Sequence, residues 1–273
     1  MAYGQVVADS VQTSSGAILG AGNATAFKNR LIDAGFIINQ RGYTSGTSLS
    51  SGSYGHDRWK GGASAGTYTF TQGSAGVPIT ITITAGSIQQ VIEGCNMPEG
   101  GTYVLSWTGT AQARYNGGSY GASPLAVTGI TAGSNVTIEF NTGTLSYPQL
   151  EVGSTATSFD YRPYGTELQL CQRYYQRQSG FLAIAGSSTS AASCINFGTE
   201  MRASPSLSVS GVLTLSDISA ADWTQSSASV NIPAGRVNTR SIFFDMTTFS
   251  GLTANRPMAN VNTGNSIILS AEL

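Results

Sequence analysis

Charged residues are scarce in this chain of 273 residues. Asp, Glu, Lys and Arg together make up 10% of the sequence, and the formal net charge is -1 at pH 7. Soluble domains usually carry about 25% charged residues. The surface must therefore be covered by uncharged polar side chains or be buried in part against other subunits. Because basic residues are not in excess, the composition does not favour binding to nucleic acid.

Histidine, cysteine and long apolar runs are scarce as well. The chain has one histidine and three cysteines, Cys95, Cys171 and Cys194, whose wide spacing fits neither a disulfide framework nor a zinc site. We expect buried free thiols and synthesis in a reducing cytoplasm. No apolar run approaches the roughly 18 residues that span a membrane. The first ten residues lack the pattern of a signal peptide.

The patterns that are present are those of β-strands. Isoleucine and threonine alternate strictly over residues 79–84, which predicts a half-buried strand. Further strand signals recur about every ten residues, separated by glycine-rich turns, and this spacing is typical of antiparallel sandwiches. The sequence therefore predicts an all-β protein with a first sandwich over residues 35–163 and a second over residues 179–273.

Residues 1–34 carry weaker signals. They contain one short strand signal and two possible helical turns, for which Asn23 or Thr25 would be the N-cap. A segment with so few apolar residues cannot bury a core by itself. We therefore expect residues 1–34 to be an arm that another protein receives.

One helix is expected between the two sandwiches, in a linking segment over residues 164–178. Thr166 and Gln169 have the spacing of a capping box, which predicts a helix from about residue 166 to residue 176. Its apolar residues recur at i, i+3 and i+7. The residues expected to form this joint are Pro163 and Gly165 in the turn and Leu168, Cys171 and Tyr175 on the packed face.

Catalytic patterns are weak. His56 stands beside Asp57 in a glycine-rich segment, but no nucleophile motif accompanies this pair. A glycosidase needs two facing carboxylates, and the acidic candidates are scattered over different segments: Glu93, Glu99, Glu139, Glu151 and Asp160. We expect no enzymatic activity, with hydrolysis of a polysaccharide kept as an alternative.

Two kinds of binding site are considered. Aromatic rings with nearby hydrogen-bonding groups can hold sugars, and the candidates in the region 107–120 are Trp107, Arg114, Tyr115, Asn116 and Tyr120. The alternative is that Trp107 belongs to the core and the tyrosines contact other subunits. No cofactor is expected. A structural calcium ion would take oxygen ligands, for which Glu151 and Asp160 are weak candidates.

Three parts of the chain resemble a known family. The stretch "QLEVGSTATSFDYRPYGTELQLCQRYYQ" resembles the joint found in many bacteriophage tail-fibre and virion-appendage proteins, in which a jelly roll similar to carbohydrate-binding modules is followed by a helix. The start, "MAYGQVVADSVQTSSG", resembles their virion-proximal arm. The stretches "INQRG" and "YGHDRWKG" resemble the opening of their jelly roll, and "FGTEMRASPSLSVSG" fits their C-terminal domain.

The resemblance implies a structural protein of a phage virion, made in the cytoplasm of the host bacterium. It implies a homotrimer whose residues 1–34 attach to other virion proteins and whose jelly roll contacts a glycan of the host surface. Neither nucleic acid nor a membrane is an expected partner. The alternatives are a capsid decoration or head-fibre protein without a receptor role, and a polysaccharide-degrading enzyme.

Overall fold

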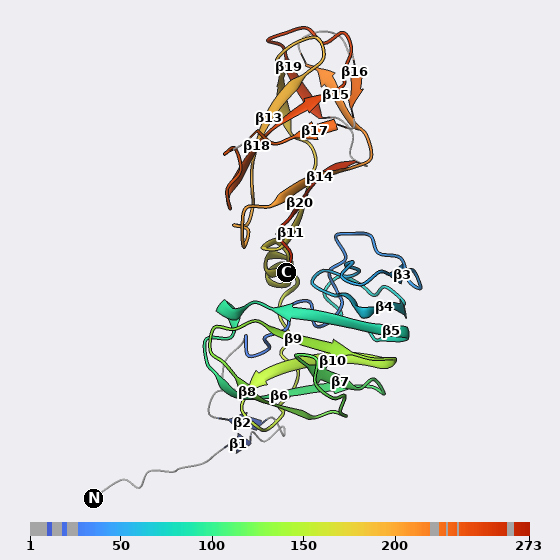
Figure 1. Cartoon of the computed structure of the whole chain (residues 1–273), viewed down its shortest axis with the longest axis vertical. Helices are drawn as coiled ribbons and strands as arrows, with labels where there is room; N and C mark the ends of the chain where they lie inside the picture. The colour runs from blue at the N-terminus through green and yellow to red at the C-terminus, as the bar shows by residue number, and fades with distance from the viewer. Residues whose placement is uncertain are drawn as a thin grey trace, which may run out of the picture. The chain divides into compact units, whose positions relative to one another are not determined.

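The structure is a computed structural model that describes residues 10–12, 18–20, 27–218, 224–227, 229–233, 235–260 and 265–273. The chain is nearly all β and has one α-helix within these residues (Figure 1). It divides into two compact units, residues 1–168 with Leu273 and residues 169–272. The predicted all-β class, with sandwich domains and one short helix, is confirmed.

The first unit contains a two-stranded ribbon and one large set of antiparallel strands. The ribbon consists of β1 (Ser10–Gln12) and β2 (Ile18–Gly20). The remaining strands are β3 (Ser48–Leu49), β4 (Lys60–Phe70), β5 (Ile81–Ile92), β6 (Gly101–Thr108), β7 (Ala113–Tyr115), β8 (Leu125–Ile130), β9 (Val136–Phe140) and β10 (Gly143–Val152), with one 3-10 turn at Gly94–Asn96.

Strand β10 changes its partner along its length. Residues 143–145 pair with β5 and residues 146–152 pair with β6, and a bulge between Ser146 and Gln149 follows directly after this change of partner. Strands that pass from one sheet of a sandwich to the other do so at bulges or bends. Strand β10 thereby joins the sheet of β3, β4, β5, β9 and β7 to the sheet of β6 and β8.

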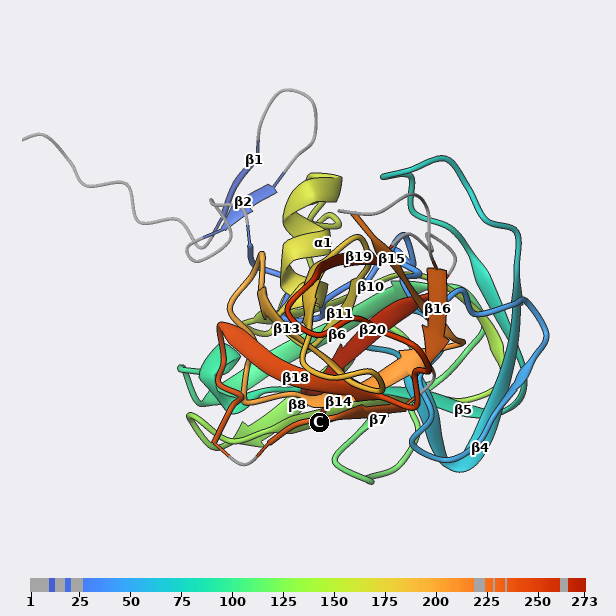
Figure 2. The same ribbon diagram turned by 90° about the horizontal axis from the view of Figure 1, so that it is seen from above.

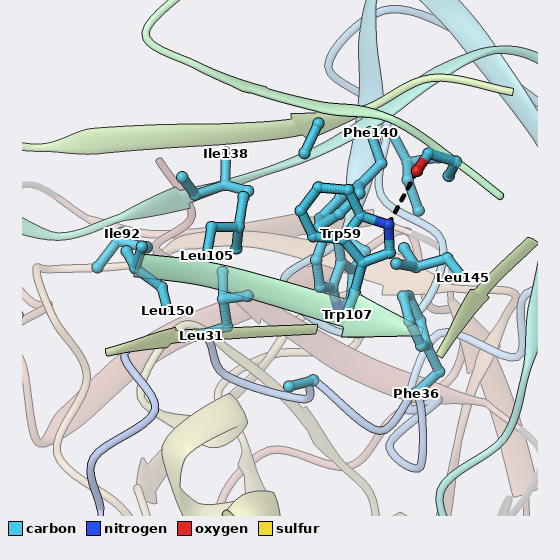
Figure 3. Close-up of a cluster of buried hydrophobic side chains, with 14 of the residues drawn as sticks. Leu31, Phe36, Trp59, Ile92, Leu105, Trp107, Ile138, Phe140, Leu145 and Leu150 are labelled. Carbon is cyan, nitrogen blue, oxygen red and sulfur yellow. Dashed lines mark hydrogen bonds between the residues drawn. The ribbon is translucent and has the colours of Figure 1, made fainter. Parts of the chain in front are cut away.

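The core of this unit lies between the two sheets (Figure 3). The alternation in the isoleucine–threonine run is confirmed, because Ile81 and Ile83 are buried while Thr80 and Thr84 are exposed. Strands β6, β9 and β10 contribute the facing side chains, among them Leu105, Trp107, Val136, Ile138, Phe140, Leu145 and Leu150. Burial of apolar surface at about 25 cal/mol per Å² is the main force that holds the two sheets together.

The segment before the first sandwich strand belongs to this core. Leu31 and Ala34 are buried in it, and the backbone N–H of Arg30 donates to the Leu150 carbonyl at 2.8 Å. The expected boundary between arm and sandwich at residue 34 is therefore too late. No helix forms over residues 27–34, and the two cap candidates, Asn23 and Thr25, lie outside the described residues.

The second unit also consists of two antiparallel sheets. Its strands are β11 (Tyr175–Gln178), β12 (Leu182–Ala185), β13 (Ala191–Asn196), β14 (Ser206–Ser210), β15 (Leu213–Asp217), β16 (Thr224–Ser227), β17 (Ser229–Asn231), β18 (Ser241–Thr247), β19 (Pro257–Asn260) and β20 (Ser266–Ser270). The order is β11-β20-β14 in one sheet and β16-β15-β19-β12-β13-β18-β17 in the other. Their shared core includes Leu213, Leu215, Ile242, Phe244, Met258, Ile267 and Leu269.

Helix α1 (Tyr164–Gln172) differs from the predicted helix at both ends (Figure 2). It begins right after Pro163, and the Glu167 N–H donates to the Pro163 carbonyl. It ends at Gln172, so Tyr175 lies in β11 and not on the helix, contrary to the prediction. The buried residues over 164–178 are Glu167, Cys171, Tyr174, Tyr175 and Gln176, whereas Leu168 is half-buried. The only described helix is too short to cross a membrane.

The cysteines form no disulfide. Cys171 is buried as expected, but Cys95 and Cys194 are exposed, which contradicts the expectation of buried thiols for these two. Cys194 lies on β13 and alternates with Ser193 and Ile195, which point into the core of the second unit. Strand alternation therefore places this thiol on the outer face of the sheet.

Candidate functional site

The predicted sugar-binding region contains a network around a buried carboxylate. Glu139 in β9 lies opposite Arg114 in β7, on the face of the sheet that points away from the core. The Arg114 Nε donates to Glu139 Oε2 at 2.8 Å. Hydroxyl groups of Ser87 and Tyr120 donate to Glu139 Oε1 at 2.5 and 3.2 Å. Both oxygens of this carboxylate are thus engaged by side chains of the same unit.

These contacts keep Glu139 ionised. Burial by itself would raise the pKa of Glu139, but the hydrogen bonds from Arg114 and Ser87 outweigh it and lower the pKa below its usual value. Arg114 also lies over the Tyr120 ring, at 4.6 Å from its centre, which adds a cation–π contact. Gly62 in β4 allows this close packing, because a Cβ there would lie 2.1 Å from the Ser87 Oγ. The network holds the loop after β7 against the sheet.

The other predicted sugar-binding residues lie apart from this network. Trp107 in β6 is a core residue with 7% of its surface exposed; its Nε1 donates to the Ala111 carbonyl at 2.8 Å, and its ring packs edge-on against Phe140. Tyr115 is half-buried against the same core. Asn116 is exposed, and its side chain accepts from the Thr137 N–H at 2.9 Å. The structure therefore brings Arg114 and Tyr120 together but places Trp107 in the opposite sheet.

The two calcium candidates are surrounded by donors from the chain. Glu151 is fully buried, accepts from the backbone and hydroxyl of Thr157 at 2.8 and 2.7 Å, and lies 4.0 Å from the Lys28 ammonium. The Asp160 carboxylate lies 3.8 Å from Arg162. Among the described residues, no three His, Cys, Asp or Glu side chains gather where they could hold a metal ion.

Four of the five acids considered for glycoside hydrolysis have a cationic neighbour, and Glu93 is half-buried just before the 3-10 turn. Glu99 contacts Arg30 at 2.8 Å, and Glu139, Glu151 and Asp160 have the cationic neighbours given above. A general acid of a glycosidase needs a raised pKa and access to the sugar bond. Glu139 has the opposite shift, and Glu151 has no exposed surface. These carboxylates stabilise the sandwich by ion pairing.

His56 and Asp57 are interior residues. The His56 ring lies among Phe36, Tyr43, Tyr68 and Phe70, and its Nδ1 is 2.9 Å from the Tyr68 hydroxyl. Burial lowers the pKa of His56 to about 4. Asp57 accepts from the backbone and side chain of Gln40 at 2.7 and 2.9 Å. Because both side chains are fully buried, neither reaches a substrate at the surface.

The joint between the sandwich and helix α1 is built around Arg162. This guanidinium donates to the Leu31 carbonyl at 3.1 Å, to the Asn29 carbonyl, and to both oxygens of Glu167 at 3.2 Å. Glu167 in turn accepts from the Asp33 N–H. Burial, followed by the charges of Asp57 and Glu167, raises the pKa of Asp33 well above its usual value. Pro163 and Gly165 are exposed here, so charged rather than turn residues fix this joint.

An apolar face covers the middle of the large sheet in the second unit. Leu182 and Ile184 of β12 point outward with 68% and 60% of their surface exposed, while Ala183 and Ala185 point into the core. Pro257 and Ala192 lie directly beside Ile184 on the neighbouring strands. With Ile218, Phe243 and Cys194 these residues line a hollow of about 440 Å³. We call this surface the β12 face.

No known family model matches this chain, and no curated protein sequence matches it either. The β12 face was not predicted from the sequence, although the run "FLAIAG" contains a usable signal. In residues 182–185 large and small apolar residues alternate, so Leu182 and Ile184 fall on one face of the strand.

Proposed function

We propose that this chain is a structural subunit of a bacteriophage virion, in a tail fibre or appendage that contacts a glycan of the host surface. Five stretches of the sequence, spread from the arm to the C-terminal domain, resemble such proteins, and the architecture of two β-sandwich units joined by a helix is compatible with them. The proposal includes a homotrimer and attachment to other virion proteins through the N-terminal arm.

The structural observation that supports the assembly of copies in this proposal is the outward orientation of Leu182 and Ile184. A monomeric soluble protein would be expected to turn the large side chains of this strand inward and the alanines outward. Here the opposite orientation leaves a contiguous apolar surface in the middle of a sheet, and such surfaces mark sites of association. A second copy of the chain is the proposed occupant, because a subunit with so few charges exposes a surface that copies can bury in symmetric contact.

Labelling of intact particles tests the proposal. Antibodies against the purified chain should bind to the tail of the phage that encodes it, and the purified chain should compete with adsorption of that phage to host cells. Labelling of the capsid shell without an effect on adsorption would instead support the decoration alternative. Particles that carry no label would overturn the assignment to the virion.

The enzyme alternative needs its own measurement. Purified host polysaccharide incubated with the chain should release no new reducing ends, because Glu139, Glu151 and Asp160 lie against cations in the sandwich. Release of reducing ends at a rate that follows the amount of chain would contradict the proposal and favour the enzyme.

A further inference from the structure

A second surface of the first unit has the character of a ligand site. A groove of about 360 Å³ opens beside the bulge of β10, between β6 and the segment that follows β10. The residues that define it are Trp107, Tyr147, Gln149, Ser158, Phe159 and Tyr161. Its volume falls in the range of about 300–1,000 Å³ found for small-molecule sites. We call it the aromatic groove.

Three rings form one side of the aromatic groove. The ring centres of Phe159 and Tyr161 are 5.0 Å apart, and those of Tyr147 and Phe159 are 5.2 Å apart, with each pair edge to face. Tyr161 keeps 66% of its surface exposed. Large aromatic side chains are usually buried, so an exposed ring supported by two others provides a flat apolar surface in contact with water.

The backbone at the bulge directs one of these rings. Tyr147 has a φ of 54°, in the left-handed region that bulky residues rarely adopt. The bulge lies where β10 leaves one sheet for the other, and it turns Tyr147 toward the groove instead of into the strand ladder. Backbone in sparsely populated φ/ψ regions clusters at active sites, ligand clamps and switch regions.

Buried hydrogen bonds hold the segment that carries two of these rings in place. Gln149 has 1% of its surface exposed; its Nε2 donates to the Ser158 carbonyl at 3.2 Å, and its Oε1 accepts from the Asp160 N–H at 2.7 Å. Glu151 fixes Thr157 through two further hydrogen bonds. The segment that carries Phe159 and Tyr161 is thus attached to β10 before any ligand arrives, which reduces the entropy that binding would cost.

The lining of the groove is uncharged. It combines the aromatic rings with hydroxyl, amide and small side chains, and no Asp, Glu, Lys or Arg belongs to it. A charged ligand would lose water here without gaining an ion pair. A pyranose sugar fits this lining, because its C–H face can pack on an aromatic ring while its hydroxyls form hydrogen bonds with the polar side chains.

We propose that the aromatic groove binds a neutral sugar, one or two rings long, which stacks on Tyr161 and Phe159. The inference rests on the proposed function, because it assigns the glycan contact to a particular site. It places that contact at the groove rather than at the loop of Tyr115 and Tyr120, where Arg114 covers the Tyr120 ring. Trp107 remains part of the site as a lining residue of the groove.

The test uses the full chain and saturation-transfer NMR with the methyl glycosides of glucose, galactose, mannose and N-acetylglucosamine. A sialic acid glycoside serves as the charged comparison. At least one neutral glycoside should bind, and the sialic acid glycoside should not. The affinity for the neutral glycoside should fall about tenfold or more in the Tyr161→Ala and Phe159→Ala variants. The control is Tyr164→Ala, which changes an exposed tyrosine outside the groove and should bind the glycoside as the parent does.

Three results would contradict the proposed sugar site. Failure of all four neutral glycosides to bind the parent chain would overturn the sugar site. Loss of binding in a Tyr115→Ala/Tyr120→Ala variant, with binding kept in Tyr161→Ala, would move the site to the loop after β7. A Tyr161→Ala variant with a changed solution mass would show that the ring is a subunit contact. None of these results affects particle labelling, so failure of the groove and failure of the proposed function can be told apart.

Discussion

Arg162 contacts Glu167 at 3.2 Å, and the two side chains are only 5% and 7% exposed. Together they connect three segments that are distant in sequence: the chain before the sandwich, the end of the sandwich, and the first turn of α1. This buried pair explains why residues 160–167 include charged and bulky side chains in a chain made mostly of small residues. A buried ion pair tolerates few replacements, because removal of one partner leaves the other charge without compensation.

Arg162→Met should therefore destabilise the first unit strongly. The change leaves Glu167 and Asp160 buried without their shared cation and should lower the free energy of unfolding by about 3–5 kcal/mol. The matched control is Arg30→Met, since Arg30 pairs with Glu99, whose side chain is 49% exposed. That variant should lose less than about 1 kcal/mol. Urea unfolding of both variants makes the comparison, and equal losses would contradict the role given to Arg162.

Tyr174→Ala should cost more stability than Leu168→Ala, although the sequence predicted Leu168 and not Tyr174 on the packed face. Tyr174 is fully buried and Leu168 is half-buried. Loss of a buried aromatic side chain costs about 3–5 kcal/mol, whereas Leu168→Ala should stay below about 2 kcal/mol. Thermal melting of the two variants tests this order. A larger effect at Leu168 would mean that Leu168 is covered in the assembled protein.

The single histidine provides a direct test of the first core. His56 has a pKa lowered by burial to about 4, against 6.5 for a free histidine. Between these two pH values the unfolded chain binds a proton that the folded chain does not, so stability falls as the pH drops from 6.5 toward 4. The total loss is roughly 3 kcal/mol. An NMR titration of the imidazole signals should give a pKa near 4, and a value above 6 would show that the ring is solvated.

Removal of residues 1–26 should separate attachment from folding. The first buried residues of the sandwich segment begin at Asn29, so this truncation keeps Leu31 and Ala34 in the core. The truncated chain should melt and sediment like the parent but should no longer join phage particles. Particles that contain the truncated chain would show that the arm is not the attachment segment. Removal of residues 1–34 would confuse the two effects, because it also deletes core side chains.

The sequence predicted the strands better than it predicted the joint. The alternation of isoleucine and threonine over residues 79–84 matches the alternation of buried and exposed positions in a strand. The buried face of Ile81 and Ile83 was therefore predicted correctly. The predicted helix ran too far because Tyr175 continues the helical spacing from Leu168 and Cys171. The chain leaves the helix at Gln172, since residues 175–178 pair with β20, and this long-range contact is not visible in local spacing.

The candidate sites were also hard to predict, because they form from residues whose contacts appear only after folding. Arg162 and Glu167 are ordinary surface residue types, and only folding shows that they are buried together. The aromatic groove could not be read from the sequence, because Tyr147 and Tyr161 meet only after the chain has turned back along β10. Strand β19 has no clear strand pattern in the sequence, because it begins at Pro257, a residue that usually ends strand patterns.

The solution mass of the chain tests the central claim most directly, namely that the β12 face is a contact between copies. Sedimentation equilibrium at low concentration should give the mass of a trimer for the parent chain. The Leu182→Ser/Ile184→Ser variant should give a monomer with unchanged strand content, because both side chains point away from the core. The control is Val212→Ser, an exposed apolar residue outside the hollow, which should remain a trimer. A parent chain that sediments as a monomer, or a double variant that remains a trimer, would contradict the account.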